Sequence, residues 1–174
     1  MSDTTTPMFR ATARLGTAYA LEGLCSFFPH DDPRSARLSD RMWGLEHGDA
    51  QADRDLRHAA RRVCELCPVR HQCLADAMVN QLQDGIYGGL GRTERKTLAR
   101  IAEQQGLPVR GVLVRGMPAL SASEALRRRT LVAAWLEAHP EMPAVVREHE
   151  ARTRREHRHR QQAQPTLTPP PIEQ

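Results

Sequence analysis

The four cysteines are the feature that most limits how this 174-residue chain can fold. Cys25 stands alone, and Cys64, Cys67 and Cys73 follow close together. Four thiolates bind zinc or an iron-sulfur cluster, and either site needs ligands brought together from separate elements. Only seven residues are Phe, Trp or Tyr, so a metal would help to stabilise a small core. The pattern therefore predicts a fold organised around a four-thiolate metal site.

Spacing alone leaves three chemistries open at these cysteines. A zinc site would hold the fold, a cluster would add redox chemistry, and Cys64 with Cys67 could carry out thiol-disulfide exchange. The lone distant cysteine and the five-residue gap before Cys73 are less like the paired hooks of zinc ribbons, which favours a cluster. The βαβ context of a thioredoxin-like enzyme is not indicated by the sequence pattern.

Hydropathy indicates a cytoplasmic protein with no membrane partner. Residues 1–14 lack the apolar stretch of a secretory signal, and no run approaches the roughly 20 apolar residues of a membrane helix. Disulfides are usually reduced in the cytosol, so metal binding is the expected use of the thiols.

The apolar periodicity predicts an all-α protein. We expect helices over residues 35–45, 50–65, 67–83 and 93–105, with the third beginning near Cys67 or Pro68. Ser121 and Glu124 form a capping box for a further helix that reaches Pro140. Residues 143–160 are too polar for a core helix, so we expect either a solvated helix or a segment that orders on binding.

Composition divides the chain into four parts. These are a flexible leader (1–20), a cysteine domain (21–106), a basic C-terminal extension that is helical or partly disordered (107–160), and a disordered tail rich in Pro and Gln (161–174).

The positive charge lies in the extension. Residues 1–91 carry net −2, whereas residues 92–160 carry net +7, and 24 of the 25 basic residues are Arg. Because the arginine fork suits phosphates and base edges, this asymmetry predicts an anionic polymer as partner. Codon composition would also explain the Arg excess, and a solvated, charge-balanced helix is an alternative for the basic stretch. The candidate DNA-contacting residues here are Arg127, Arg128, Arg129, Arg152, Arg154 and Arg155.

Two ordered motifs add a family resemblance. Cys25 is followed by Phe27-Phe28-Pro29, and the three clustered cysteines are followed by Gly85-Ile86-Tyr87-Gly88-Gly89. Over roughly residues 20–105 the chain thus resembles the WhiB-like family of actinobacteria and their phages. The resemblance implies a 4Fe-4S cluster on the four cysteines, and about four short helices wrapped around it. It also implies a redox and nitric-oxide responsive transcription regulator, rather than an enzyme, that binds the primary sigma factor and promoter DNA.

The resemblance assigns sigma contact to the first motif and the glycine turn, namely Phe27, Phe28, Gly85, Tyr87, Gly88 and Gly89. Tyr87 replaces the family's Trp and offers less apolar area, so sigma binding is expected to be weaker or directed to another surface. The alternative is that the turn only reverses the chain.

Some family members also carry an Arg-Gly-Arg-Pro hook for the minor groove. This chain has Arg115-Gly116-Met117-Pro118, so Arg115 is a DNA-contact candidate and a plain turn is the alternative. A structural zinc-binding DNA-binding module and an apo-form protein disulfide reductase remain the competing functions.

Overall fold

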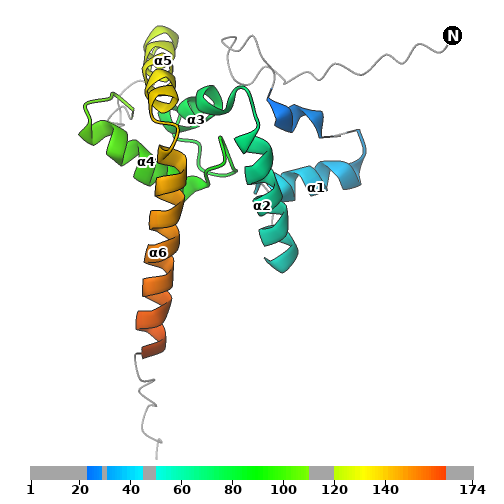
Figure 1. Ribbon diagram of the computed structural model, residues 1–174. Coiled ribbons are helices and arrows are strands. Elements are labelled where there is room, and N and C mark those ends of the chain that lie inside the picture. Colours follow the sequence, from blue (N-terminus) through cyan, green and yellow to red (C-terminus); the bar gives the residue numbers. More distant parts are fainter. Residues whose placement is uncertain (1–22, 29–30, 45–49, 110–119, 164–174) are drawn as a thin grey trace, which may run out of the picture.

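Helices make up the fold in the part of the chain that the structure describes. The computed structural model describes residues 23–28, 31–44, 50–109 and 120–163. A short 3-10 helix, η1 (Leu24–Phe27), comes first and is followed by α1 (Pro33–Trp43), α2 (Ala50–Glu65), α3 (Arg70–Val79), α4 (Arg92–Gln104), α5 (Ala122–Ala138) and α6 (Met142–Ala163). The predicted all-α class is confirmed (Figure 1). None of the helices in these ranges is long and apolar enough to cross a membrane.

Local signals explain most helix ends. The Asp32 carboxylate accepts hydrogen bonds from the backbone N-H groups of Arg34 (2.9 Å) and Ser35 (3.1 Å), so α1 begins two residues before the predicted start. The second helix has the predicted bounds. The third begins at Arg70 and not at Cys67 or Pro68, because the chain makes a turn after α2 in which the Arg70 N-H bonds the Cys67 carbonyl at 3.2 Å.

The third helix is also shorter than predicted, since it ends at Val79 and Gln81 takes a positive φ of 51°. Ser121 caps α5 as predicted, with its hydroxyl accepting from the Glu124 N-H at 3.2 Å, while the Glu124 carboxylate pairs with Arg127 and Arg128. Three residues assigned to the tail, 161–163, continue α6. The leader, the Arg115 motif and residues 164–174 lie outside the described residues.

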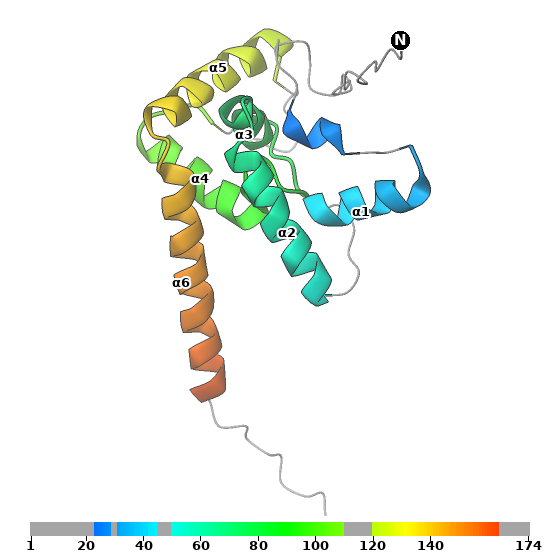
Figure 2. The same ribbon diagram turned by 45° about the vertical axis from the view of Figure 1, so that its right-hand side comes forward.

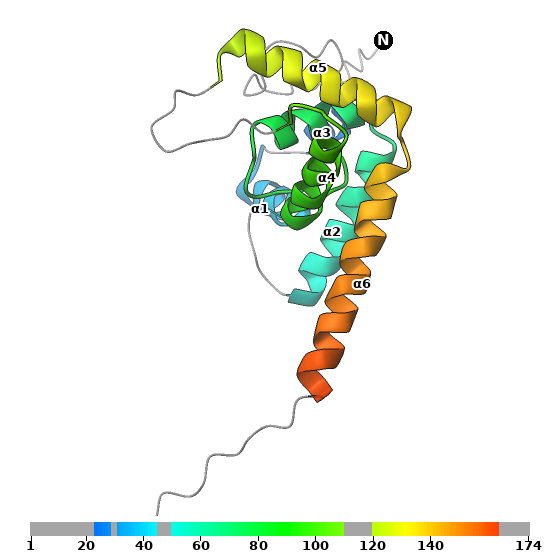
Figure 3. The same cartoon turned by 90° about the vertical axis from the view of Figure 1, so that its left-hand side faces the viewer.

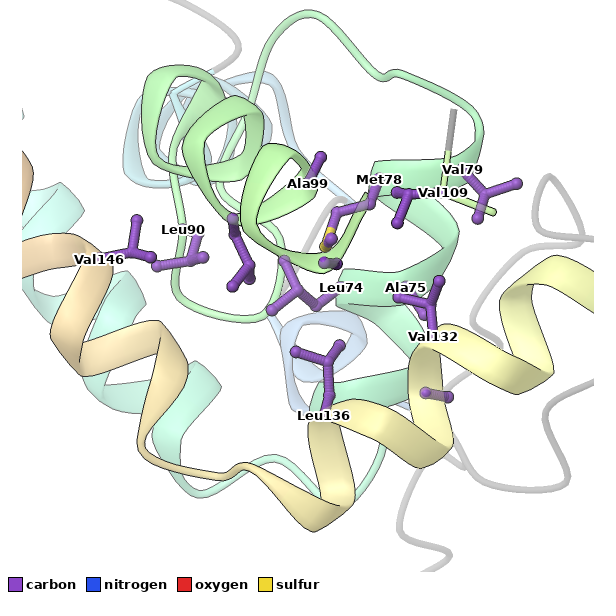
Figure 4. Packing of buried hydrophobic residues seen from close by; sticks show 13 residues of the cluster. Leu74, Ala75, Met78, Val79, Leu90, Ala99, Val109, Val132, Leu136 and Val146 are labelled. Atoms are coloured by element: carbon purple, nitrogen blue, oxygen red, sulfur yellow. The ribbon is translucent and has the colours of Figure 1, made fainter. Parts of the chain in front are cut away.

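The larger of two apolar clusters joins α3, α4 and α5 and receives the first turn of α6. Leu74, Val132 and Leu136 are fully buried, and their side chains meet between α3 and α5 (Figure 4). Val146 of α6 and Val109 are buried in the same cluster. The domain boundary at residue 107 stays a prediction. In the structure, apolar side chains from both sides of that boundary share one core.

The smaller cluster lies where α1 meets α2 and contains Met42, Trp43, Ala60, Cys64 and Ile86. Two polar contacts hold this end of the fold together. Arg41 of α1 pairs with Asp53 of α2 at 2.9 Å, and the Ile86 N-H donates to the Trp43 carbonyl at 2.7 Å. Cys64 thus belongs to a hydrophobic core. Its packing there fixes the C-terminal end of α2.

The last helix leaves the body of the protein. Pro143 and Val146 are buried at its start, whereas every residue from 152 to 163 is exposed. In all three views of the ribbon the second half of α6 runs beyond the other described helices (Figures 1, 2 and 3). We call residues 152–163 the α6 arm.

Candidate metal centre

The four cysteines come from four places in the fold. Cys25 is in η1, Cys64 is near the end of α2, Cys67 is in the turn that follows, and Cys73 is in α3. Backbone hydrogen bonds wind the chain between the last three, with the Cys67 N-H donating to the Cys64 carbonyl at 3.3 Å and the Cys73 N-H donating to the Val69 carbonyl at 2.8 Å. The continuous winding keeps all three cysteines at the junction of α2 and α3.

Gly23 shows that η1 lies against this junction. A Cβ placed on Gly23 would be 3.3 Å from the Cys25 sulfur and 4.0 Å from the Cys67 sulfur. The Leu24 N-H also donates to the Cys67 sulfur at 3.4 Å. The two sulfurs, 42 positions apart in sequence, are therefore neighbours in the fold.

Electrostatics link all four thiols. Burial first, and the nearby cysteines after it, raise the pKa of Cys64 to about 11 and that of Cys73 to about 12. The pKa of Cys25 is raised by desolvation first and by Cys67 second. The metal-free thiols of Cys25, Cys64 and Cys73 therefore hold their protons at neutral pH and would release them when a metal binds.

The glycine turn supplies N-H groups to two of the sulfurs. Tyr87 and Leu90 exchange backbone hydrogen bonds of 3.1 and 3.0 Å, with Gly88 and Gly89 between them at φ of 56° and 85°. A backbone hydrogen bond from Gly89 lowers the pKa of Cys64 after burial has raised it, and one from Gly88 acts in the same way on the pKa of Cys73. Besides reversing the chain, the turn therefore donates hydrogen bonds to sulfur.

The position of Gly88 has room only for glycine. A Cβ on Gly88 would lie 2.6 Å from the Leu74 Cβ and 2.9 Å from the Arg70 carbonyl oxygen. Arg70 itself donates from Nε to the Gly88 carbonyl at 3.2 Å. The turn is thus pressed onto the start of α3, where Cys73 lies.

Arg95 holds the turn from the other side, and the sequence reading missed it. This guanidinium is buried and donates to the carbonyls of Gly85 (2.6 Å), Leu90 (2.9 Å) and Leu82 (2.7 Å). It also lies 5.0 Å from the centroid of the Tyr87 ring. An arginine in the first turn of a helix is usually a surface residue, so nothing in the sequence pointed to this role.

A buried ion pair fixes α4 against α2. Glu94 receives two hydrogen bonds of 3.0 Å from Arg61 and a third of 2.8 Å from the Gly91 N-H. Because Glu94 is buried, this bidentate contact sets the distance between the helix that carries Cys64 and the helix that carries Arg95.

The two phenylalanines of the first motif have different surroundings. Phe28 packs edge-on against Trp43, with 5.8 Å between ring centroids, and so belongs to the smaller core. Phe27 has 49% of its surface exposed. Leu66, between two cysteines, is 80% exposed and was not singled out from the sequence.

The predicted DNA-contacting arginines divide into two groups. In α5, Arg127 and Arg128 pair with Glu124 at 2.8 and 2.6 Å, and Arg129 pairs with the buried carboxylate of Asp76 at 2.6 Å. Those in α6, namely Arg152, Arg154 and Arg155, are exposed on the α6 arm. Arg115 lies outside the described residues.

The four cysteines are grouped in the fold, since Cys25, Cys64 and Cys67 all raise the pKa of Cys73. Within the described ranges no three His, Cys, Asp or Glu side chains form a group that could hold one metal ion. A four-iron cluster distributes its protein ligands over four metal atoms, so its ligands are spread more widely than those of one zinc ion. The donor set of four thiols with N-H groups directed at two of them fits such a cluster.

The described fold is a small set of helices in which four cysteines lie near the junction of α2 and α3. Residues 26–98 match the family model described as "Transcription factor WhiB", a match that begins one residue after Cys25 and includes the other three cysteines. The match covers less than half of the chain and supports WhiB-like family membership.

Curated relatives match over the same part of the chain. The transcriptional regulator WhiB2 of Mycobacterium tuberculosis is 44% identical over 41 residues, which are 24% of this chain and 46% of the relative. The regulator WhiB of Streptomyces coelicolor is 44% identical over 43 residues (25% and 49%). The redox-responsive transcriptional regulator WhiB3 of Mycolicibacterium smegmatis is 40% identical over 55 residues (32% and 55%). The chain spans about half the length of these relatives, and no solved structure gives a significant match.

Proposed function

We propose that this protein is a cytoplasmic transcription regulator that carries a 4Fe-4S cluster on Cys25, Cys64, Cys67 and Cys73. The observation that carries the proposal is the grouping of four thiols with N-H donors from the glycine turn. The names of the relatives supply the regulatory role, and one of them is named redox-responsive. When bound, such a cluster supplies electron transfer and a centre that oxygen and nitric oxide degrade.

The residues of this chain would do three things for the cluster. The thiols release protons and bind iron, the N-H groups of Gly88 and Gly89 offset negative charge on sulfur, and the apolar side chains around Cys64 exclude water. Arg95 keeps the two glycine N-H groups in place by holding the carbonyls of the turn.

A non-enzymatic role is supported by the thiols themselves. A cysteine that attacks a disulfide usually has a lowered pKa. Burial acts in the opposite direction on Cys64, whose pKa it raises to about 11. We therefore propose that Cys64 and Cys67 are metal ligands rather than a reductase pair.

Anaerobic purification tests the cluster. We expect brown protein containing iron and sulfide, with visible absorption that is lost in Cys64→Ser or Cys73→Ser. A matched control is Ser26→Ala, which changes a residue next to Cys25 but removes no sulfur. Colourless protein that binds zinc and withstands oxygen would establish the structural zinc module instead.

The partners proposed for the regulator are the primary sigma factor and DNA. Exposed apolar side chains beside two cysteines, Phe27 and Leu66, suit a protein partner better than Phe28, which is packed on Trp43. Gly85 and Tyr87, which are half-buried, would complete the sigma contact, whereas Gly88 and Gly89, also expected there, are buried beside the cysteines. Exposed arginines of the C-terminal extension would contact DNA.

The sigma contact can be tested by co-purification of the loaded protein with the primary sigma factor. Phe27→Ala and Leu66→Ala should each weaken it, whereas Leu38→Ala should not, although Leu38 is 51% exposed on α1. Equal retention of sigma by all three variants would place the contact on another surface.

A further inference from the structure

The α6 arm is a part of the fold that the metal centre does not explain. Residues 152–163 extend from the body, and all twelve are exposed. At 1.5 Å per residue the arm is about 18 Å long. The arm packs no side chain against the rest of the described structure. Its residues therefore serve either solubility or contact with a partner.

Charge on the arm is not balanced. It carries five arginines and one glutamate, Glu156. One weak contact offsets part of this charge, since Arg152 lies 4.0 Å from Glu156. A solvated helix with alternating charges would show more such pairs, and the arginines of α5 show the contrast because they are held by Glu124 and Asp76.

Three of the five arginines, Arg154, Arg155 and Arg158, also share a face. Arg154 and Arg158 are one turn apart, as are Arg152 and Arg155, and Arg155 and Arg158. Like charges at this spacing destabilise a helix, and a short helix without tertiary packing is marginal in water. A partner with closely spaced negative charges would remove that repulsion and stabilise the arm.

Dimensions indicate which anion the arm fits. An α-helix with its side chains is about 10–12 Å across, and the major groove of B-form DNA is about 12 Å wide. A single helix lying in that groove has phosphates on both sides, so arginines on one face reach a strand while shorter polar side chains face the bases.

We infer that the α6 arm is a DNA-binding helix that enters the major groove of duplex DNA, with Arg154, Arg155 and Arg158 on phosphates. This inference rests on the proposed function for its choice of DNA and goes beyond it by naming the element and the groove. It does not require the Arg115 motif or the arginines of α5.

The arm is anchored next to the metal centre. Arg147, just before the arm, donates to the Glu65 carboxylate at 2.9 Å, and a Cβ on Gly89 would lie 3.6 Å from the same guanidinium. Thr97 of α4 also donates to Glu150 at 2.7 Å. These contacts fix where the arm leaves the body.

Salt dependence of DNA binding tests the inference on the full-length, cluster-loaded protein. The probe is a short mixed-sequence DNA duplex, and affinity is measured over a range of salt concentrations. Each phosphate contact contributes about 0.9 to the slope of log affinity against log salt. Changing Arg154, Arg155 and Arg158 to Gln should therefore reduce the slope by about 2 to 3.

A matched control removes the same charge elsewhere. Arg34, Arg37 and Arg92 are exposed on α1 and α4, and changing all three to Gln should leave the slope nearly unchanged. Two further readouts identify the groove. Guanine N7 lies in the major groove and should be protected from methylation, and an RNA duplex of the same sequence should bind more weakly because its major groove is deep and narrow.

Three results would overturn the inference: an unchanged slope in the arm variant, an equal loss in the control variant, or equal binding of the RNA duplex. Iron and sulfide are measured on the same preparations. Absent iron with an intact arm effect would refute the proposed cluster and leave the DNA-binding arm standing, so the two failures are distinguishable.

Discussion

Replacing Gly88 with alanine separates two costs that the glycine turn combines. One is conformational, since φ at Gly88 is +56°, where a residue with a Cβ is disfavoured by about 1–2 kcal/mol. The other is steric, because the new Cβ would lie 2.6 Å from the Leu74 Cβ and 2.9 Å from a carbonyl oxygen. Overpacking of this kind typically costs about 1–3 kcal/mol. We expect Gly88→Ala to lower the free energy of unfolding by about 2–5 kcal/mol.

Gly106 provides the control. Its φ is +85°, and an added Cβ would meet nothing within 4 Å, so Gly106→Ala carries only the conformational cost. The assay is urea unfolding of the reduced, metal-free chain followed by circular dichroism. With a slope of about 1–3 kcal/mol per M, the two midpoints should differ by an amount of the order of 1 M. Equal midpoints would show that α3 yields to the new methyl group, and would refute the steric argument.

Three other outcomes are expected. Arg95→Met should lower the free energy of unfolding by at least about 3 kcal/mol, because buried carbonyls of the turn lose their donor. Thermal unfolding would detect this change. A decrease of less than about 1 kcal/mol would mean that water replaces the guanidinium. Arg129→Leu should cost about 3–5 kcal/mol by leaving a buried aspartate unpaired, whereas Arg127→Leu on the exposed face of the same helix should cost no more than about 1 kcal/mol in the same unfolding assay. In metal-free protein at neutral pH, iodoacetamide should label Cys25 before Cys64, because Cys64 is buried and its pKa is raised to about 11. The labelling rate of Cys64, measured by mass spectrometry, should keep rising as the pH approaches that value. Labelling in the opposite order would contradict the burial of Cys64.

Helices were the part of the fold that the sequence predicted best. Leu56, Ala60 and Val63 repeat at helical spacing, and α2 has the predicted bounds. The end of α3 was less predictable, because the apolar pattern continues to Leu82 while the backbone turns at Gln81 to bring the glycine turn back onto α3. That reversal depends on tertiary contacts, which periodicity does not encode.

The sequence pointed to the four cysteines of the candidate site and not to the residues that support them. Thiol chemistry is specific enough that spacing pointed to the four cysteines. Arg95 was not predictable, since its burial follows from carbonyl groups supplied by a loop five to thirteen residues earlier. In the same way Arg129 looked like a phosphate contact in sequence, and only the packing of α5 on α3 brings it to Asp76.

The attachment of α6 at its N-terminal end alone also has a mechanical consequence. Val146 is the last buried residue of the helix, and 17 residues separate it from Ala163. That length is about 25 Å, so a tilt of about 10° at the base moves the far end by about 4 Å. The base is tied through Arg147 to Glu65, the residue after Cys64. A displacement at the end of α2 too small to disturb the core would therefore be magnified at the tip, where a spectroscopic label could measure it.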